Sequence, residues 1–554
     1  FLSGGSQGAN TVNIGGDLTL NDDARVLVTL SDRDENGDPA ARSTRFAAGG
    51  TVTIGDGASP GAPELVVTLA PGGFADPALR RFTILTGASI QINDDFVVND
   101  DLFFFDLNPL GAASAPGTYQ IDLQDSGATL ANAGTTPNRR AVGTALDELR
   151  GNGAGGDSQL EDLLENLNVL TNDDVDGALD GASADSLAAA TNIRLAAAAR
   201  TWRSISNRLA LARGRSIGHQ DRRAKRQATT RRDLRARRRG ELPDPADRPG
   251  VERPNESNVG RNVVADEAAG NAADDAAGPW VAWLEGSGLI GEVDSDEAAG
   301  YDYRLVGPIL GADRALGEKV RIGFATSATH ATYDADDSVG EGDLTSVEGA
   351  VYAAWVGAPV EILLGGRYGH SWVETERRTQ IEQFSGRADG DFEGDEFGAY
   401  AEFTRAFGAP SKIEIAPFAR AAYTRLDFDD FDEDGSNPLR MEVDGDEIDS
   451  LVSSVGMRIA LEREMDEGFV FRPRLEASWG REWGDRDRPI QGRFAAGTTP
   501  IELEGAELPR DRAQISVGWE IGYNANASLF IGWDGRFGED LVENALSLGV
   551  RAAW

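Results

Sequence analysis

The stretch Asp511–Tyr523, DRAQISVGWEIGY, alternates apolar and polar residues along most of its length. Ala, Ile, Val, Trp, Ile and Tyr fill the odd-numbered positions from 513, and Arg, Gln, Ser, Gly, Glu and Gly fill the even-numbered positions from 512. Successive side chains of a β-strand point to opposite faces, so this pattern predicts a strand with one apolar face and one polar face. The same split recurs at 527–533 and 546–554.

Working outward from this stretch, twelve segments of the C-terminal half show the same alternation. They lie at 279–290, 302–316, 319–333, 344–357, 359–373, 392–408, 411–429, 447–463, 468–483, 510–523, 525–537 and 541–554. Connections after even-numbered segments are short. Connections after odd-numbered segments are long, acidic and glycine-rich, and they lie at 291–301, 334–343, 374–391, 430–446 and 484–509. The last connection, 538–540, is the exception because it is short. Short turns at one end and long loops at the other are typical of membrane barrels. We therefore predict a 12-stranded antiparallel outer-membrane β-barrel over residues 279–554.

A soluble up-and-down barrel is the alternative, because alternation by itself does not say which face meets water. The polar faces argue against it, since Glu361, Arg367 and Ser371 share one face of the segment 359–373. A dry interior would leave such charges unpaired at a cost of several kcal/mol each, whereas a water-filled lumen would not. On the opposite, lipid-facing sides we expect an aromatic girdle of Tyr368, Trp372, Trp519, Tyr523 and Trp533.

The composition of the 554-residue chain fits passage through an oxidising compartment. Cysteine is absent, and stray thiols would cross-link in a periplasm. The formal net charge of −39 argues against nucleic acid as a partner of the whole chain and suits a strongly hydrated exterior. The sequence starts at Phe1 without a leader, so we expect a processed or truncated product, and we expect the barrel to be monomeric.

Residues 1–134 contain short β-type runs punctuated by Gly, Asn and Asp. The segment TVNIGGD at 11–17 is echoed by TVTIGDG at 51–57, which suggests rungs of a parallel β-helix. A β-sandwich is the alternative for this region. The fold class predicted for the whole chain is mainly β, with this β-helix-like region and a helical segment in front of the barrel.

The helical segment spans residues 135–215. Apolar spacings of three and four predict helices at 141–149, 160–170 and 184–211, and Asp157 is expected to cap the second. The third helix is long enough, at ~1.5 Å per residue, to thread a ~30 Å hydrocarbon layer. Residues 216–278 form a charged linker that we expect to be disordered. One helix is expected in the lumen, with 184–213 as first choice and the basic run 222–239 as second, its arginines facing carboxylates such as Glu361 and Glu520.

Three places in this layout resemble the classical autotransporters of type V secretion. TPNRRAVGTALD at 136–147 resembles the segment after the secreted β-helix of that family, and residues 182–213 resemble the helix that leads towards the barrel. WVAWLEGSG at 280–288 is similar to the family's first barrel strand, GPILGAD at 307–313 to its second and GVRAAW at 549–554 to its last. The linker 216–278 departs from the family, in which the helix runs almost directly into the first strand.

The resemblance implies that the N-terminal region is a passenger, which the barrel carries to the surface of the bacterial outer membrane. It implies as partners outer-membrane lipids and lipopolysaccharide, the barrel-assembly machinery and periplasmic chaperones. It also marks the last strand as the barrel-insertion signal, through Leu546, Leu548, Val550, Ala552 and Trp554. We expect an adhesive or structural passenger. A porin or receptor-like barrel with a surface scaffold is the alternative, although such a barrel would not need residues 1–213.

No catalytic residue is predicted. The three histidines, His219, His330 and His370, all lie beyond residue 213 and cysteine is absent, so residues 1–213 cannot hold a Ser–His–Asp or Cys–His arrangement. An enzymatic passenger would therefore have to lie upstream of Phe1. No cofactor is predicted, with calcium as the one candidate at two acidic turns that reproduce the first half of an EF-hand loop. These turns contain Asp32, Asp34, Asn36 and Asp38 in the first, and Asp430, Asp432 and Asp434 in the second.

Overall fold

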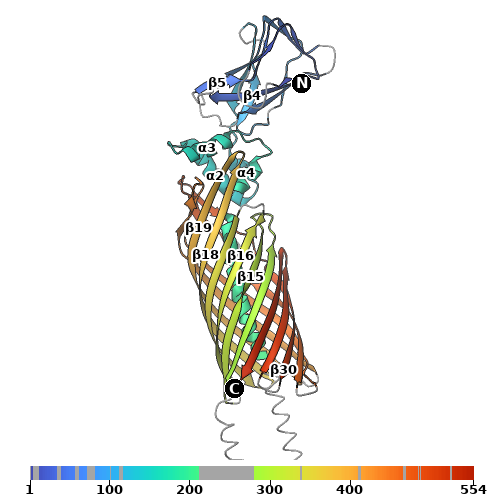
Figure 1. The fold of residues 1–554 in the computed structure, drawn as a ribbon, viewed down its shortest axis with the longest axis vertical. Helices are drawn as coiled ribbons and strands as arrows, with labels where there is room; N and C mark the ends of the chain where they lie inside the picture. The colour runs from blue at the N-terminus through green and yellow to red at the C-terminus, as the bar shows by residue number, and fades with distance from the viewer. Residues whose placement is uncertain are drawn as a thin grey trace, which may run out of the picture.

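The computed structural model shows a molecule of three parts: a stack of short strands, a group of helices, and a long closed barrel (Figure 1). The structure describes residues 2–3, 11–33, 39–56, 61–70, 81–99, 101–111, 116–210, 280–317, 319–336, 340–357, 359–409, 413–465, 469–484, 486, 488–523 and 527–554. The linker 216–278, with its basic run at 222–239, lies outside the described residues.

The N-terminal strands form three sheets in which strands from successive passes of the chain lie side by side in parallel. β2 pairs with β6 and β6 with β9 in one sheet, β3 with β7 and β7 with β10 in the second, and β4 with β8 and β8 with β11 in the third. The interior between the sheets is apolar, and Val26, Phe46 and Val52 are fully buried there. The strands are β1 (Leu2–Ser3), β2 (Thr11–Ile14), β3 (Leu18–Leu20), β4 (Arg25–Arg33), β5 (Pro39–Ser43), β6 (Arg45–Ala48), β7 (Thr51–Ile54), β8 (Glu64–Leu69), β9 (Arg81–Thr86), β10 (Ser89–Ile92), β11 (Val97–Asn99), β12 (Phe105–Pro109) and β13 (Thr118–Asp125).

The sequence echo between 11–17 and 51–57 does not mark equivalent places in this stack. Thr11 of β2 pairs with Arg45, whereas Thr51 of β7 pairs with Ser89, so the two copies lie in different sheets. The echo therefore does not repeat one position of the stack, because the alternation that both copies share is satisfied by any of the three sheets. The passes that contain β2 to β11 pair in parallel, but β9 with β13 and β12 with β13 pair antiparallel, so the parallel β-helix stays a prediction for this region.

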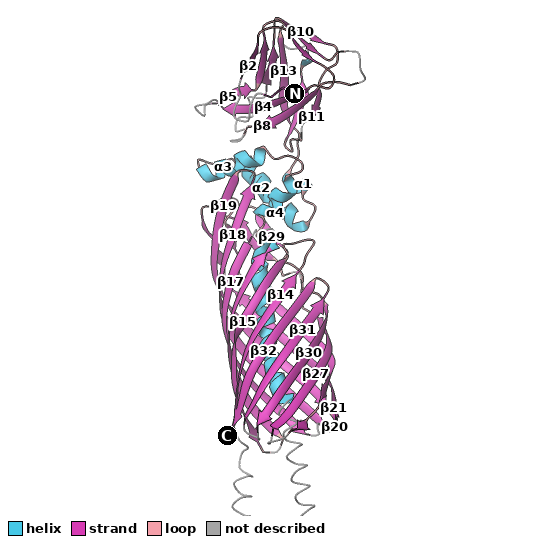
Figure 2. Cartoon of the chain, turned by 45° about the vertical axis from the view of Figure 1, so that its right-hand side comes forward, coloured by secondary structure: helices cyan, strands magenta, loops and turns pink. Residues whose placement is uncertain are grey.

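Helices connect this stack to the barrel (Figure 2). They are α1 (Leu130–Ala133), α2 (Pro137–Asn152), α3 (Ser158–Asn168), α4 (Val175–Ala182) and the 3-10 helix η2 (Asp185–Ala188), followed by a helix at residues 189–210. We name residues 130–188 the helical cap and residues 189–210 the luminal helix. Asp157 caps α3 as predicted, because its side chain accepts hydrogen bonds from the backbone N–H groups of Gln159 and Leu160. None of the described helices combines the length and apolar character needed to span a membrane.

The C-terminal half closes into a barrel of 12 antiparallel strands, as predicted. The barrel strands are β14 (Trp280–Val293), β15 (Tyr301–Leu316), β16 (Val320–Ala335), β17 (Gly340–Gly357), β18 (Val360–Ile381), β19 (Phe384–Arg405), β21 (Ile413–Phe428), β25 (Glu447–Ala460), β27 (Phe469–Glu482), β30 (Asp511–Tyr523), β31 (Ala527–Gly538) and β32 (Leu541–Ala553). The first strand pairs with the last along its length, from Val281 with Ala553 to Val293 with Leu541, and this pairing closes the barrel.

The long connections carry more structure than the sequence suggested. The predicted loop 374–391 is instead the top of a hairpin, in which β18 and β19 pair from Val360 with Arg405 to Ile381 with Phe384. Glu382 adopts φ 51° in the resulting tight turn. The other connections contain the short strands β20 (Phe407–Ala409), β22 (Phe431–Asp432), β23 (Asp434–Gly435), β24 (Met441–Val443), β26 (Arg463–Glu464), β28 (Ile490–Phe494) and β29 (Pro500–Leu503). Strands β22, β24, β28 and β29 pair into a small sheet above the barrel mouth.

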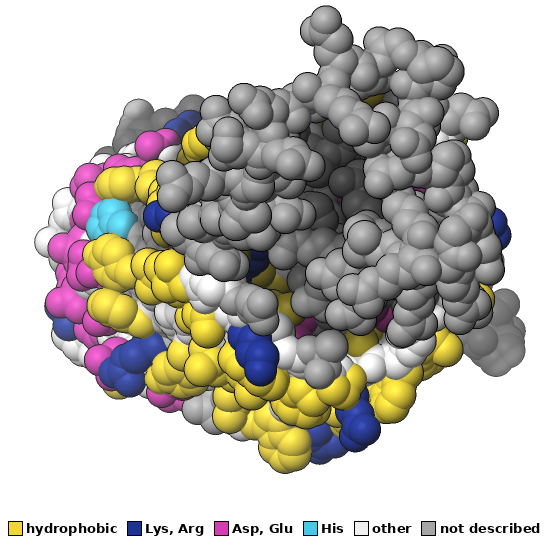
Figure 3. Space-filling view, turned by 90° about the horizontal axis from the view of Figure 1, so that it is seen from below, with side chains coloured by type: hydrophobic (Ala, Val, Ile, Leu, Met, Phe, Trp, Pro, Cys, Tyr) yellow, Lys and Arg dark blue, Asp and Glu magenta, His cyan; other side chains and the backbone are white. Residues whose placement is uncertain are grey.

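An apolar belt surrounds the barrel. On β18 the outward positions from Ile362 to Tyr368 carry apolar or aromatic side chains or glycine. Above them His370 lies 2.9 Å from Asp395, and Glu374 is exposed and acidic, so the charged zone begins at His370. Apolar side chains also gather along the outside of the barrel when it is viewed from the short-turn end (Figure 3). The belt therefore fixes the lipid-covered zone between the short turns and the charged upper halves of the longest strands.

Aromatic rings on neighbouring strands lie over barrel glycines. A Cβ at Gly311 would collide with the Trp283 ring, and one at Gly342 would lie 2.5 Å from the ring of Tyr333. The two members of each pair are directly opposite in the register. The rings fill the space that glycine leaves open in a strand, which compensates for the weak strand preference of glycine.

Candidate functional site

The luminal helix occupies the interior of the barrel along most of its height (Figures 1 and 2). Its alanine-rich sequence favours a helix, and residues 189–210 contain four arginines and no acidic residue. Ile193, Trp202 and Ile205 pack against inward-facing apolar residues of the barrel. The segment 184–213, our first choice for the helix in the pore, is therefore confirmed over residues 189–210. The α-helix begins later than expected because residues 185–188 form a 3-10 helix.

Three arginines of the helix form ion pairs with carboxylates of the barrel wall. Arg194 Nη2 lies 3.4 Å from Glu396 Oε2, and both side chains are buried. Further down the helix, Arg203 contacts Asp534 at 3.2 Å. Near the short-turn end Arg208 Nε lies 3.0 Å from Asp313, which is also buried. Buried charges are tolerated only when paired in this way, so the helix and the wall are matched in charge.

Hydroxyl groups of the helix donate to a second set of wall carboxylates. Thr201 donates to Glu348 at 2.8 Å, and Ser204 donates to Glu285 at 2.8 Å. Arg200 donates to the hydroxyl of Thr329 at 3.4 Å. Hydrogen bonds to ionised acceptors are roughly twice as strong as neutral ones, and their directionality fixes the rotation of the helix about its axis.

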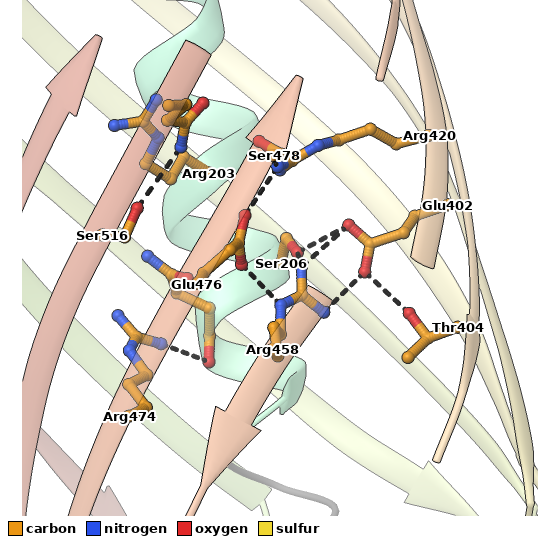
Figure 4. A network of polar contacts seen from close by, with 12 residues as sticks. Arg203, Ser206, Glu402, Thr404, Arg420, Arg458, Arg474, Glu476, Ser478 and Ser516 are labelled. Carbon is orange, nitrogen blue, oxygen red and sulfur yellow. Dashed lines mark hydrogen bonds and ion pairs between the residues drawn. The ribbon is translucent and has the colours of Figure 1, made fainter. Parts of the chain in front are cut away.

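The densest contact is a network centred on Arg458 of β25 (Figure 4). Arg458 donates to Glu402 at 2.8 and 3.1 Å, to Glu476 at 2.6 Å and to the helix hydroxyl of Ser206 at 2.9 Å. Ser206 in turn donates to Glu402 at 2.9 Å, and Arg420 pairs with Glu476 at 2.6 Å. Two guanidinium groups thus balance two carboxylates, so the network anchors the helix without leaving a net buried charge.

Glycines of the wall form sockets for large side chains of the helix. A Cβ at Gly365 would lie 2.5 Å from the Trp202 ring, and one at Gly394 would lie 2.8 Å from Arg194. Trp202 also stacks on Tyr400, the residue paired with Gly365 on β19, with ring centroids 5.0 Å apart and planes inclined by 16°. Such sockets accept the helix in one register only, because protein interiors tolerate little overlap.

The helix leaves little free space in the lumen. A cavity of about 110 Å³ lies between the helix and the wall, lined among others by Trp202, Arg203 and Arg420. On this measure one water needs only roughly 10–15 Å³, so the cavity has room for several waters. The described lumen is therefore plugged at this level.

The residues predicted for the insertion signal and for the aromatic girdle lie on the outer face of the barrel. The proposed insertion-signal residues lie on the outer face, with Leu546 63%, Leu548 55% and Val550 50% exposed, and Trp554 68% exposed at the barrel end. The predicted girdle residues also face outward, but at different levels: Tyr523 contacts Phe469 at the short-turn end, whereas Trp372 lies beside the charged upper zone. The girdle and the signal stay predictions, because position alone does not test them.

The two expected partners of the luminal arginines differ in outcome. Glu520 binds the wall residues Arg551 at 2.9 Å and Arg472 at 3.6 Å. Glu361 is buried on the inward face of β18, and its pairing with a luminal arginine stays a prediction. The partners that do bind the helix, such as Glu396 and Asp313, share the inward parity of their strands with many other residues. The alternation of inward and outward side chains along a strand was the only signal in the sequence. It gives neither the height of a residue in the barrel nor its position around the barrel axis.

Of the two predicted calcium turns, the structure describes only the second in full. Residues 34–38 lie outside the described residues, and the first turn with them. In the second, Asp430 accepts the backbone N–H of Gly445 at 2.9 Å, while Asp432 and Asp434 belong to strands that pair with different neighbours. No group of three or more His, Cys, Asp or Glu suited to a metal occurs among the described residues.

Comparisons with known proteins agree with this geometry. Residues 282–534 match the family model described as the autotransporter beta-domain. Two proteins of Serratia marcescens, each named extracellular serine protease, are 22% identical over 270 residues and 23% identical over 271 residues. These matches cover 49% of this chain and 26% of each relative, so the chain spans about a quarter of the length of the curated relatives it matches.

Solved structures with a similar fold include translocator domains. The translocator domain of the autotransporter NalP from Neisseria meningitidis has a TM-score of 0.42 at 14% identity, covering 52% of this chain and 93% of that one. The beta domain of the Bordetella autotransporter BrkA has a TM-score of 0.37 at 17% identity, covering 50% of this chain and 100% of that one. Residues 282–534, which make up most of the barrel around the luminal helix, are an autotransporter β-domain, and the barrel belongs to the bacterial outer membrane.

Proposed function

We propose that this chain carries its own N-terminal region through the outer membrane and displays it at the cell surface. The observation that supports this most strongly is the path of the chain: the strand stack and helical cap lie at the loop-bearing end, and the luminal helix leads from there to the short-turn end. The barrel then begins at Trp280 at that same end, beside the last residue, Trp554. A chain with this path has its N-terminal part on one side of the membrane and its barrel start on the other.

The luminal helix is, in this proposal, the last part of the exported chain, and it stays in the barrel as a plug. The ion pairs and glycine sockets hold it there after export. A porin would need an open lumen, and the small cavity beside the helix does not provide one. The last strand would serve as the recognition signal for the assembly machinery, while lipids and lipopolysaccharide cover the apolar belt.

The displayed region is proposed to be adhesive or structural, with the three stacked sheets as the end of a β-helical passenger. Parallel stacked strands provide an extended repetitive surface, and every histidine of the chain lies beyond residue 213. The two named serine proteases support a second candidate, in which the barrel displays an enzymatic passenger. A serine-directed covalent inhibitor should label the exported protein only if that second candidate is correct.

Protease treatment of intact cells tests the proposed orientation. An epitope placed in the exposed turn at Asp23 should be removed by external protease, while the barrel stays intact and continues to migrate anomalously in unheated gels. An epitope in the linker 216–278 should be protected until the outer membrane is opened. Protection of both epitopes in intact cells would refute the orientation.

A further inference from the structure

The helical cap rests on the loop-bearing end of the barrel and shares its hydrophobic core (Figure 2). Leu146, Leu149 and Leu163 of the cap belong to the same buried cluster as Phe384 of the barrel hairpin and Leu503 of β29. These residues are far apart in the sequence, so the cap completes its core with side chains that the barrel loops supply. A plain connecting segment would not bury its apolar residues in this way.

Asn138 of α2 fixes the cap to the loop after β29. Its side-chain amide donates to the carbonyl of Glu504 at 2.8 Å and accepts from the N–H of the same residue at 2.8 Å. The amide also donates to Asp185 at 3.1 Å, and Asp185 accepts the backbone N–H of Ala299 at 3.0 Å. Asn138 and Asp185 are both buried, so losing these partners would leave polar groups unsatisfied.

Two more contacts hold the cap from other sides. The buried side chain of Asn166 in α3 accepts the backbone N–H of Gln383 at 3.0 Å, in the tight turn of the β18–β19 hairpin. Glu148 of α2 accepts the backbone N–H groups of Thr498 and Thr499 at 3.2 and 2.8 Å. The first loop, the third hairpin and the fifth loop thus grip the cap together, and we name these three elements (294–300, 380–385 and 488–508) the outer clamp.

We propose that the outer clamp holds the exported N-terminal region on the barrel even when the chain is cut between the luminal helix and the first barrel strand. The occupant of the clamp is residues 130–188 of the same chain. This inference rests on the proposed function, because it assumes that the cap lies outside the cell. Its consequence is that proteolysis of the linker would leave the displayed region attached to the cell surface.

The test inserts a recognition sequence for a site-specific protease between residues 245 and 246 of the full-length chain. The purified protein in detergent is cut and run on a size-exclusion column, and the N-terminal fragment is followed relative to the barrel. The luminal helix could by itself hold the fragment in the barrel. Its packing against the barrel wall is therefore weakened with Trp202→Ala and Ile205→Ala. Both residues are buried and uncharged, so their removal leaves no unpaired charge in the lumen.

The expected result is that this helix-weakened protein still elutes as one complex after cutting. Adding Asn138→Ala and Asn166→Ala should raise the dissociated fraction by about tenfold, since each buried partner lost weakens the contact. Ile501→Ala with Leu503→Ala is the matched change on the barrel side, which leaves the cap sequence intact. Thr144→Ala, at an exposed position of α2, is the control and should have no effect.

Two results would overturn the inference. If the helix-weakened protein dissociates on cutting although the clamp is intact, the luminal helix is what retains the fragment. If no combination of clamp substitutions releases the fragment, the clamp contacts do not contribute to retention. The proposed function is tested separately, because it fails only if the N-terminal epitope of the uncut wild-type protein is absent from the cell surface.

Discussion

Gly365 of β18 faces the indole of Trp202 so closely that an added side-chain atom would overlap it. A Cβ at this position would lie 2.5 Å from Cζ3 and 2.7 Å from Cη2 of the ring. The ring is also held by Tyr400, the residue paired with Gly365 on β19, which stacks on it with centroids 5.0 Å apart. We therefore expect Gly365→Ala to loosen the luminal helix without affecting the outward face of the barrel.

The size of the effect follows from the cost of overpacking a buried contact. An extra methylene in a packed interior costs ~1–3 kcal/mol, which corresponds to a change of about 5- to 150-fold in the ratio of docked to undocked helix. Trp202→Ala should cost more, ~3–5 kcal/mol, because it removes a whole aromatic side chain. In the double variant the clash is gone, so Gly365→Ala should add nothing to the effect of Trp202→Ala.

A disulfide between helix and wall provides the assay. The hydroxyls of Thr201 and Ser327 lie 3.3 Å apart, and the chain has no cysteine of its own, so Thr201→Cys with Ser327→Cys can form only one intramolecular bond. The rate of oxidation, measured by gel shift over a temperature series, reports how often the helix is docked. We expect the temperature of half-maximal cross-linking to fall for Gly365→Ala and to be unchanged for Gly349→Ala, whose added Cβ meets nothing within 4 Å. If the penalties of Gly365→Ala and Trp202→Ala add fully in the double variant, the socket explanation is wrong.

Three further predictions concern the wall, the network and the clamp. Val550→Asp should reduce outer-membrane assembly, measured as heat-modifiable protein, since a charge facing lipid at this depth costs on the order of 1–3 kcal/mol, whereas Ser547→Ala on the lumen side should assemble normally. Arg458→Met should lower thermal stability by ~3–5 kcal/mol by leaving the buried Glu402 without its guanidinium partner, while Glu476 keeps Arg420. Arg378→Met, which removes an exposed ion pair, should cost less than ~1 kcal/mol, and equal losses would contradict the network. Hydrogen bonds from the fifth loop hold the pKa of Glu148 at about 2, below its ordinary value of 4.5, so the contact is at full strength above pH 4.5 and is lost as pH falls towards 2. Hydrogen exchange of α2 should therefore rise over this pH range in the wild type, and Glu148→Gln should remove that part of the pH dependence.

The sequence by itself determined the barrel, because a two-residue period survives in every strand whatever lies around it. The alternation around Trp519 and Val550 predicted which side chains face lipid, and both are exposed. Strand order followed as well, since consecutive antiparallel strands joined by short turns have few other ways to pair. The alanine-rich segment also has a high helix propensity, which predicted a helix at 184–211. The luminal helix at 189–210 lies within that range.

Only the tertiary structure decided which polar groups meet. The alternation along their strands predicts that Glu396 and Glu520 both point into the lumen. In the folded barrel, the tilt of the strands brings Glu396 to Arg194 of the helix and Glu520 to arginines of the wall. The acidic, glycine-rich connection 374–391 was read as a loop because nothing in its composition reveals that the two strands continue to pair above the membrane. The cap likewise depends on contacts between residues such as Asn138 and Glu504, which lie far apart in the chain and leave no periodic signal. Local patterns are set by the backbone period, whereas these contacts exist only once the chain has closed on itself.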